Sequence, residues 1–236
     1  MTSGTRERII QAAADLLASG GREAVSTRAV AAAAGVQAPA IYRQFGDMQG
    51  LLDAVASHGF SAYLSRKTSR ERAEDPVDDL RRGWDMHVEF GVTNPAFYVL
   101  MYGEIRPGAE PAAAREAMEI LHGLVQRVAA AGRLRMGVED AARMIHAASM
   151  GVVFSLIGTD PRERDPTLSH RTREAILAAV TRPSEGEAEL ASQEDLLASR
   201  AVALKAVLSD ETGELTAAEL GLLREWLDRL SRPASG

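Results

Sequence analysis

The stretch GVQAPAIYRQFGD, residues 35–47, decides the fold because it places several helix boundaries close together. Gly35 is expected to end a short helix that begins near Ser26 or Thr27, since glycine adopts a left-handed backbone or permits a close approach. A second short helix is expected from about Ala38 to Gln44, and Asp47 is placed to cap a longer helix that runs to about residue 68. The stretch therefore predicts two short helices joined by a tight turn.

The residues before this stretch predict one more helix, which supports the pair. Thr5 is a candidate cap for a helix that runs to about Ser19 and ends at Gly20 and Gly21. Ala31 must be small where the helices cross, and four apolar residues fall where a three-helix core needs bulk: Val30, Val36, Ile41 and Phe45. Three helices with a glycine turn between the last two predict a helix-turn-helix.

This arrangement leaves the start of the third helix facing outward, slim enough to enter a DNA major groove about 12 Å wide. Gln37 is expected to pair with adenine, and Ala38 or Pro39 to contact a thymine methyl group, with Ala40 beside them. Four residues are candidates for phosphate contacts, the two arginines also for guanine: Thr27, Arg28, Tyr42 and Arg43. The alternative is that these are ordinary solvated residues on a small helical bundle.

Residues 6–55 resemble the TetR family of transcriptional regulators. The resemblance rests on RERIIQAAADLLASGG, STRAVAAAAGV and APAIYRQFGDMQGLLDAV, which keep the spacing of the turn and of the third helix. It implies an N-terminal helix-turn-helix domain on a helical ligand-binding and dimerisation domain. It also implies a homodimeric repressor that a small molecule releases from operator DNA.

One position departs from the family pattern. Where the family usually has a lysine that touches phosphate, at the start of the fourth helix, this chain has Met48. The first 50 residues carry five arginines, no lysine and four acidic residues, a net charge of +1. We therefore expect modest, salt-sensitive DNA binding, supported by backbone amides at helix N-termini.

Composition excludes several other classes of protein. There is no cysteine, which excludes disulfides, thiolate metal sites and a cysteine nucleophile. No uninterrupted apolar run reaches the roughly 18 residues that span a membrane, and the N-terminus carries charges where a signal peptide is apolar. We expect a cytoplasmic protein with no membrane partner. The net charge of −6 lies entirely in residues 184–236, so it says little about a DNA-binding face near the N-terminus.

The remainder of the chain also reads as helical, which predicts an all-α fold. Further helices are expected at 76–93, 95–102, 111–131, 138–158, 167–181, 188–208 and 216–230. We expect three parts: a helix-turn-helix domain at 1–48, a ligand-binding and dimerisation domain at 49–183, and an acidic helical extension at 184–236. In the extension, leucines of two amphipathic helices are expected to pack as an antiparallel hairpin; docking of a partner protein is the alternative.

Aromatic and methionine residues in the middle of the chain predict an effector pocket beside the short helix at 95–102. Methionine adapts to varied apolar ligands, and a short helix between two long ones leaves space. The candidate lining residues are His87, Phe90, Phe97, Met101, Tyr102, Met118, His122, Met144, Met150 and Phe154. The alternative for each is plain core. His87, His122 and His146 would hold a metal only if three helices converged, and we expect neither metal nor cofactor.

The stretch at 80–108, which contains WDMHVEFGVTNPAFYVLMYG, also resembles, more loosely, a TetR subgroup with a later Trp-His-Gly motif. At the expected place this chain has Ser149 and Met150 before Gly151.

The helix at 138–158 is apolar on nearly all sides, so it needs two partners. The family resemblance implies that this helix and the one at 168–180 pair with their copies in a homodimer. A dimer would present two reading helices to half-sites about 34–36 Å apart, or a multiple of that.

Other function classes fit less well. No nucleophile with a base, phosphate-binding glycine loop or paired carboxylates suggest an enzyme. The sequence leaves open a transcriptional activator, and a relative that has lost DNA binding and acts through protein partners.

Overall fold

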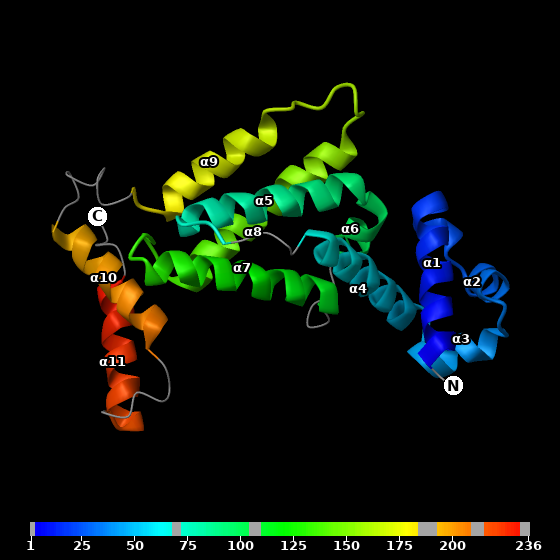
Figure 1. The fold of residues 1–236 in the computed structure, drawn as a ribbon, viewed down its shortest axis with the longest axis horizontal. Helices are drawn as coiled ribbons and strands as arrows, with labels where there is room; N and C mark the ends of the chain where they lie inside the picture. Colours follow the sequence, from blue (N-terminus) through cyan, green and yellow to red (C-terminus); the bar gives the residue numbers. More distant parts are fainter. Residues whose placement is uncertain (1–2, 68–71, 104–109, 184–192, 209–214, 232–236) are drawn as a thin grey trace. The chain divides into compact units, whose positions relative to one another are not determined.

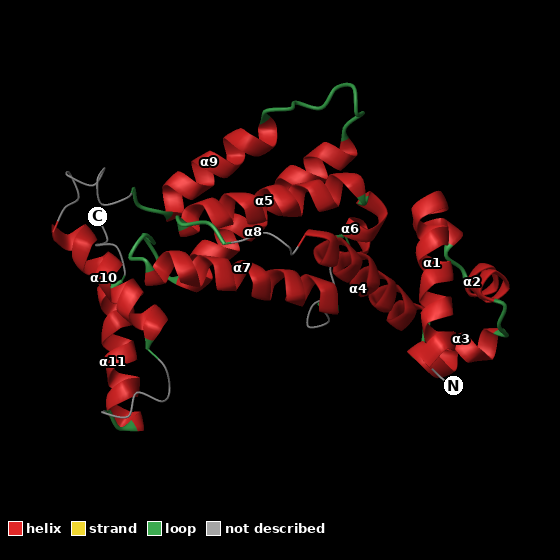
Figure 2. Ribbon diagram, in the orientation of Figure 1, coloured by secondary structure: helices red, strands yellow, loops and turns green. Residues whose placement is uncertain are grey.

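The computed structural model describes residues 3–67, 72–103, 110–183, 193–208 and 215–231. The described chain is all α, as predicted, and its only bridge between extended residues joins Leu134 and Thr181 (Figure 2). The helices are α1 (Ser3–Ala24), α2 (Thr27–Ala34), α3 (Ala38–Phe45), α4 (Met48–Lys67), α5 (Pro76–Thr93), α6 (Pro95–Tyr102), α7 (Ala112–Ala130), α8 (Val138–Gly158), α9 (Leu168–Val180), α10 (Gln193–Val207) and α11 (Ala217–Leu230) (Figure 1).

The first helix is interrupted at Gly21, where the sequence predicts its end. α1 continues to Ala24, but Gly21 has φ 67° and ψ −167°, which breaks the helix geometry at that point. Glycine reaches this conformation without a steric penalty, which allows the kink. A short helical segment follows it and ends at Ala24. Residues 188–192, expected to begin the tail helix, lie outside the described residues.

The chain divides into two compact units. Unit 1 comprises Met1–Glu71 and Glu89–Ala117, and unit 2 comprises Arg72–Val88 and Met118–Gly236. In unit 1 the core is formed by fully buried side chains of α1, α2, α3 and α4: Ile9, Leu17, Val30, Ile41, Leu51 and Val55. Of the four residues expected in the three-helix core, Val30 and Ile41 are completely buried, while Val36 and Phe45 are half-buried.

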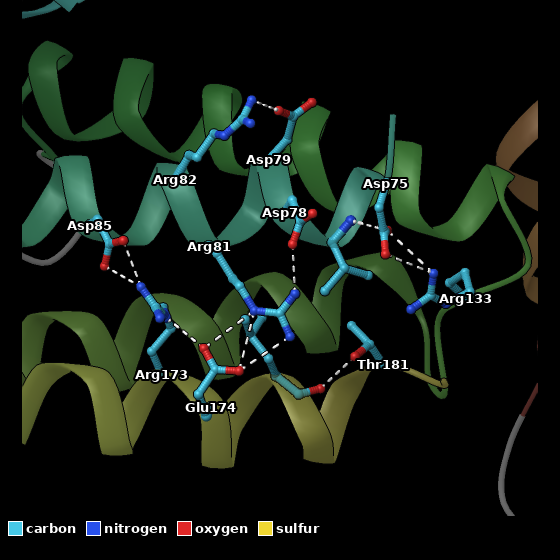
Figure 3. Close-up of polar contacts among 12 residues, drawn as sticks. Asp75, Asp78, Asp79, Arg81, Arg82, Asp85, Arg133, Arg173, Glu174 and Thr181 are labelled. Carbon is cyan, nitrogen blue, oxygen red and sulfur yellow. Dashed lines mark hydrogen bonds and ion pairs between the residues drawn. The ribbon is translucent and has the colours of Figure 1, made fainter. Parts of the chain in front are cut away.

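Unit 2 contains ion pairs within α5 and between α5 and α9 (Figure 3). Arg81 binds Glu174 at 3.2 Å and Asp78 at 2.8 Å, and Arg173 binds Asp85 at 2.5 Å. The Arg81 and Arg173 guanidinium groups outweigh the effect of burial and lower the pKa of Glu174. The carboxylate is therefore ionised at neutral pH, which keeps α9 fixed along α5.

A second group of ion pairs joins α5 to α7 and to the turn after it. Asp79 is 8% exposed and bonds to Arg127 and to the Ala73 N–H. Burial alone would raise the pKa of Asp79, but those hydrogen bonds and the charges of Arg127 and Arg82 hold the pKa below its usual value. Arg133 reaches Asp75 at 3.2 Å in the same way.

The C-terminal extension forms a helix pair within unit 2. Ser199 of α10 donates to the Gly132 carbonyl at 2.5 Å, and Lys205 binds Asp228 of α11 at 2.5 Å. Val202, Leu220 and Leu227 are buried as expected. Other apolar side chains expected to pack in the hairpin are instead about half exposed: Leu197, Leu204, Val207, Leu222, Trp226 and Leu230.

Candidate DNA interface and effector site

The turn between α2 and α3 has the geometry that the sequence predicts. Ser26 caps α2, its side chain accepting from the Ala29 N–H at 3.2 Å. At the other end Gly35 has φ 63° and ψ 41°, and the N–H groups of Gly35 and Val36 donate to the carbonyls of Ala32 and Ala31. This is a Schellman ending. No atom lies within 4 Å of a Cβ built on Gly35, so its conformation, and not a close approach, requires glycine.

The start of α3 leaves the expected reading residues accessible. Gln37 is the N-cap residue but makes no side-chain cap hydrogen bond, and Pro39 lies in the first turn, where a missing N–H is tolerated. The exposed residues of the predicted DNA face are Arg28, Gln37, Pro39, Tyr42 and Arg43, and the half-buried ones are Thr27, Ala38 and Ala40. The α3 surface thus offers an amide, a phenol and a guanidinium group to a ligand outside the protein.

Two of the predicted phosphate-contacting residues meet across the turn. The Thr27 hydroxyl of α2 and the Tyr42 hydroxyl of α3 lie 3.3 Å apart. Tyr42 is 49% exposed, so its hydroxyl can bond to Thr27 and still reach a neighbouring molecule. The two hydroxyl groups, one at the N-terminus of α2 and one on α3, can therefore bind the same neighbouring group.

The structure adds a contact that the sequence reasoning missed. Asp47 caps α4 through a bond from the Gly50 N–H at 2.7 Å, as expected. A Cβ on Gly50, however, would lie 2.1 Å from the Phe45 carbonyl oxygen. Gly50 is therefore required where α4 passes the end of α3. Met48 is half-buried at the start of α4, and Arg6 of α1 lies 5.0 Å above the Phe45 ring.

The effector candidates of unit 1 fall around α6. Phe90 is 2% exposed and lies in an aromatic cluster with Phe60 at 5.5 Å, Tyr63 at 5.0 Å and Tyr98 at 6.4 Å. Met101 is also buried, while Phe97 and Tyr102 are half-buried. Burial raises the pKa of Tyr102, so its phenol stays neutral. Phe90 and Met101 fill the core of unit 1, whereas Phe97 borders a groove.

Phe97 also packs directly on α4. A Cβ on Gly59 would lie 2.3 Å from the Phe97 ring, so the two helices touch where α4 has no side chain. α4 follows directly after α3 and Asp47, so the Phe97 ring contacts the helix that is joined to the predicted DNA face.

The other candidates lie in unit 2. The rings of His87 and His146 are 6.3 Å apart, and burial, with a smaller contribution from His146, lowers the pKa of His87 to about 4. His122 bonds to the Met118 carbonyl through Nδ1 at 3.1 Å and borders a groove between α7, α8, α10 and α11. Met144 is 38% exposed, and Met150 and Phe154 are half-buried. The described residues contain no group of three or more His, Asp or Glu side chains that could hold a metal.

α8 is more apolar than its burial explains. It contains an 18-residue window of mean hydropathy 1.4, of which 33% is buried. By length and composition alone this helix could cross a membrane, but a core helix of a soluble protein has the same properties. The helix contains no uninterrupted apolar run, because histidine, serine and small residues stand between its apolar ones. Its exposed side includes Met144, Ala147, Gly151 and Ser155.

Comparisons with known proteins agree with this geometry. A family model described as bacterial regulatory proteins, tetR family, matches residues 9–55. No curated protein matches the chain as a relative.

Several solved structures share the fold. One is a tetR family transcription regulator from Shewanella sp. PV-4, which is 18% identical to this chain and has a TM-score of 0.58. The match covers 76% of this chain and 99% of the Shewanella chain. A second is NalD, the secondary repressor of the MexAB-OprM multidrug efflux pump in Pseudomonas aeruginosa, with 23% identity, 76% and 96% coverage and a TM-score of 0.50. A third is the transcriptional regulator FadR from Bacillus subtilis in complex with stearoyl-CoA, with 19% identity, 73% and 97% coverage and a TM-score of 0.57.

Proposed function

Since the chain belongs to the TetR family of transcriptional regulators and is not an enzyme, we propose that it is a homodimeric repressor that a small apolar or aromatic effector releases from a pseudo-palindromic operator. The observation that carries this proposal is the exposed face of α3, inside the segment that the family model matches. DNA and an effector are the partners that the family implies. The site of action is the cytoplasm, where operator DNA is found.

The DNA-binding half of the proposal rests on the residues around α3. Gln37 at its start would read a base edge, while Thr27, Tyr42 and Arg43 would hold phosphates and fix the register of the helix. Arg28 adds a second exposed guanidinium group. With Met48 in place of the family's lysine, most of the electrostatic affinity would come from these two arginines and from helix N-termini.

The homodimer rests on the unburied apolar surface of α8. Only a third of the apolar window is fully buried in the single chain, and the remaining residues are half-buried or exposed. α8 and α9 lie side by side (Figure 1), and α9 also exposes small residues, Ala175, Ala178 and Ala179. Small residues permit close packing of helices, so a four-helix arrangement of α8 and α9 from two copies would bury both faces.

Regulation would work by a population shift. An effector that packs against α6 would favour the arrangement in which Phe97 moves relative to Gly59, and α4 would change the position of the reading helix. Only an effector that binds the released state more tightly can shift the equilibrium. The aromatic and methionine side chains around α6 support a mostly apolar effector with one or two polar groups.

A genomic DNA pull-down with the purified chain tests the proposal. The recovered fragments are then titrated with the protein at two salt concentrations. The single variants Tyr42→Ala and Phe97→Ala are titrated in parallel. We expect a pseudo-palindrome that binds a dimer less tightly at higher salt. Tyr42→Ala should weaken DNA binding and leave effector affinity unchanged, and Phe97→Ala should do the reverse.

Two other outcomes would change the proposal. Equally weak binding to all fragments would favour the alternative, a relative that has lost DNA binding. Met48 and the small net charge of the first 50 residues are the features that favour this alternative. Stronger DNA binding with the effector than without it would contradict release by the effector, and transcription from the recovered operator would then show whether the chain is an activator.

A further inference from the structure

Unit 1 contains a groove beside the contact of Phe97 with Gly59 on which the proposed function depends. It lies between α1, α4 and the start of α6 and has a volume of about 420 Å³. Small-molecule sites in proteins typically have volumes of about 300–1,000 Å³. Of the effector candidates, Phe97 alone borders it, so a ligand in the groove would act on that contact, and the inference rests on the proposed function.

Two polar side chains of the groove, Asp15 and Asn94, offer hydrogen-bond acceptors, beside Gln11, Thr93 and the exposed His58. Asp15 of α1 is exposed, and its Oδ1 accepts one bond from Gln11 at 2.9 Å. Asn94 uses its side-chain nitrogen to donate to Phe90 O at 3.2 Å and to Thr93 Oγ1 at 2.8 Å, which turns its Oδ1 to other donors. The groove therefore combines a carboxylate with an amide oxygen and would attract a donor that carries positive charge.

The remaining wall is aromatic. Phe97 and Tyr63 both border the groove. Because Gly59 has no side chain, the Phe97 ring lies directly against α4. Burial, then the charge and hydrogen bond of Glu89, raise the pKa of Tyr63, so the ring carries no negative charge at neutral pH. Aromatic faces attract cations as well as apolar groups.

We propose that this groove binds an organic cation, with an ammonium group at Asp15 and Asn94 and an aromatic or branched body against Phe97 and Tyr63. An anion of the same shape would meet the Asp15 carboxylate, and a neutral analogue would lose the charged hydrogen bond. The ligand would link α1, which belongs to the matched DNA-binding segment, to α4 and α6. It would thereby stabilise one arrangement of these three helices.

Binding is tested with 1-naphthylmethylammonium, whose ring fluorescence reports the bound state through anisotropy. The full chain is titrated at low salt, with 1-naphthylmethanol as the neutral analogue. We expect saturable binding of one cation per chain and at least tenfold weaker binding of the alcohol. No saturable binding of the cation, or equal binding of the two probes, would overturn the proposal.

Matched variants locate the bound cation. Asp15→Asn should weaken binding at least tenfold, whereas Glu23→Gln, which removes a charge from an exposed position of the same helix outside the groove, should not. Circular dichroism melting shows whether each variant is folded. Equal affinities for wild type and Asp15→Asn would overturn the proposal.

Phe97→Leu separates this groove from another hollow on α1. Gln11 and Asp15 also border a cavity with Ala33 and Ala34 of α2, which Phe97 does not reach. We expect Phe97→Leu to weaken the cation severalfold. If only Asp15→Asn weakens it, the ligand occupies the α2 side and the proposal is wrong. Because anisotropy needs no DNA, failure here and failure of operator binding are distinguishable.

Discussion

Gly50 lies so close to Phe45 that a Cβ on the glycine would be 2.1 Å from the Phe45 carbonyl oxygen. This contact sets how α4 passes the end of the reading helix. Since backbone must move to make room, we expect Gly50→Ala to destabilise the protein by about 1–3 kcal/mol, although alanine is the better helix former. Urea unfolding measures the change, and operator titration should show weaker binding below the melting temperature.

Gly123→Ala is the matched control. Gly123 lies inside α7 with no atom within 4 Å of a built Cβ. The same substitution there should stabilise the protein by about 0.5–1 kcal/mol. If both variants change stability in the same direction, the close approach at Gly50 does not govern this junction.

Arg43 supplies positive charge to the exposed side of α3, and it tests the phosphate contacts. We expect Arg43→Ala to weaken binding to all DNA fragments and to reduce the slope of log affinity against log salt by about 1. Arg115→Ala removes the same charge from an exposed position on α7 and should leave the slope unchanged. An unchanged slope for Arg43→Ala, with lost preference for one sequence, would assign the arginine to a base instead.

Asp79 connects stability to pH through its lowered pKa. A carboxylate whose pKa is lower in the folded chain stabilises the fold above its unfolded value, near 4, and loses this contribution as pH falls through the folded value. We expect Asp79→Asn to cost about 1–3 kcal/mol at pH 7, since Arg127 and the Ala73 N–H lose a charged acceptor.

Urea unfolding at pH 7 and near pH 3 checks this expectation. The difference between wild type and Asp79→Asn should shrink at the lower pH. Asp78→Asn, on the same helix but with a side chain that is 52% exposed, should have a small effect at both pH values. A difference that stays constant with pH would mean that the ionised carboxylate is not the stabilising form.

The helix-turn-helix could be predicted from sequence because its determinants are local. Gly35 at φ 63°, the Ser26 cap and the Asp47 cap each depend on residues within one helical turn. The close approach at Gly50 could not, because the glycine lies in a helix where no turn requires it. The clash of a Cβ on Gly50 with the Phe45 carbonyl oxygen becomes visible only when the position of α3 is known.

The candidate effector residues show a different limit. Met101 lies one turn after Phe97 on α6 and Phe90 lies on α5, yet Met101 and Phe90 are core and Phe97 borders a groove. Periodicity places a side chain on a face but does not say what covers that face. The tail shows the same: Val202 is buried and Leu204 is 45% exposed, because the surfaces that receive α10 decide the register.

Ala147 and Ala175 test the proposed dimer, since each is exposed on one of the two helices that would pair. A carboxylate at either position would be buried without a partner in the dimer, which costs several kcal/mol, but would be solvated in a single chain. We expect Ala147→Glu and Ala175→Glu to give folded monomers by sedimentation equilibrium, with far weaker operator binding. Ala112→Glu, at an exposed position on α7, adds the same charge and should leave the dimer intact. Dimers that persist in both Glu variants would place the interface elsewhere, and the half-exposed leucines of α10 and α11 would then be the next surface to substitute.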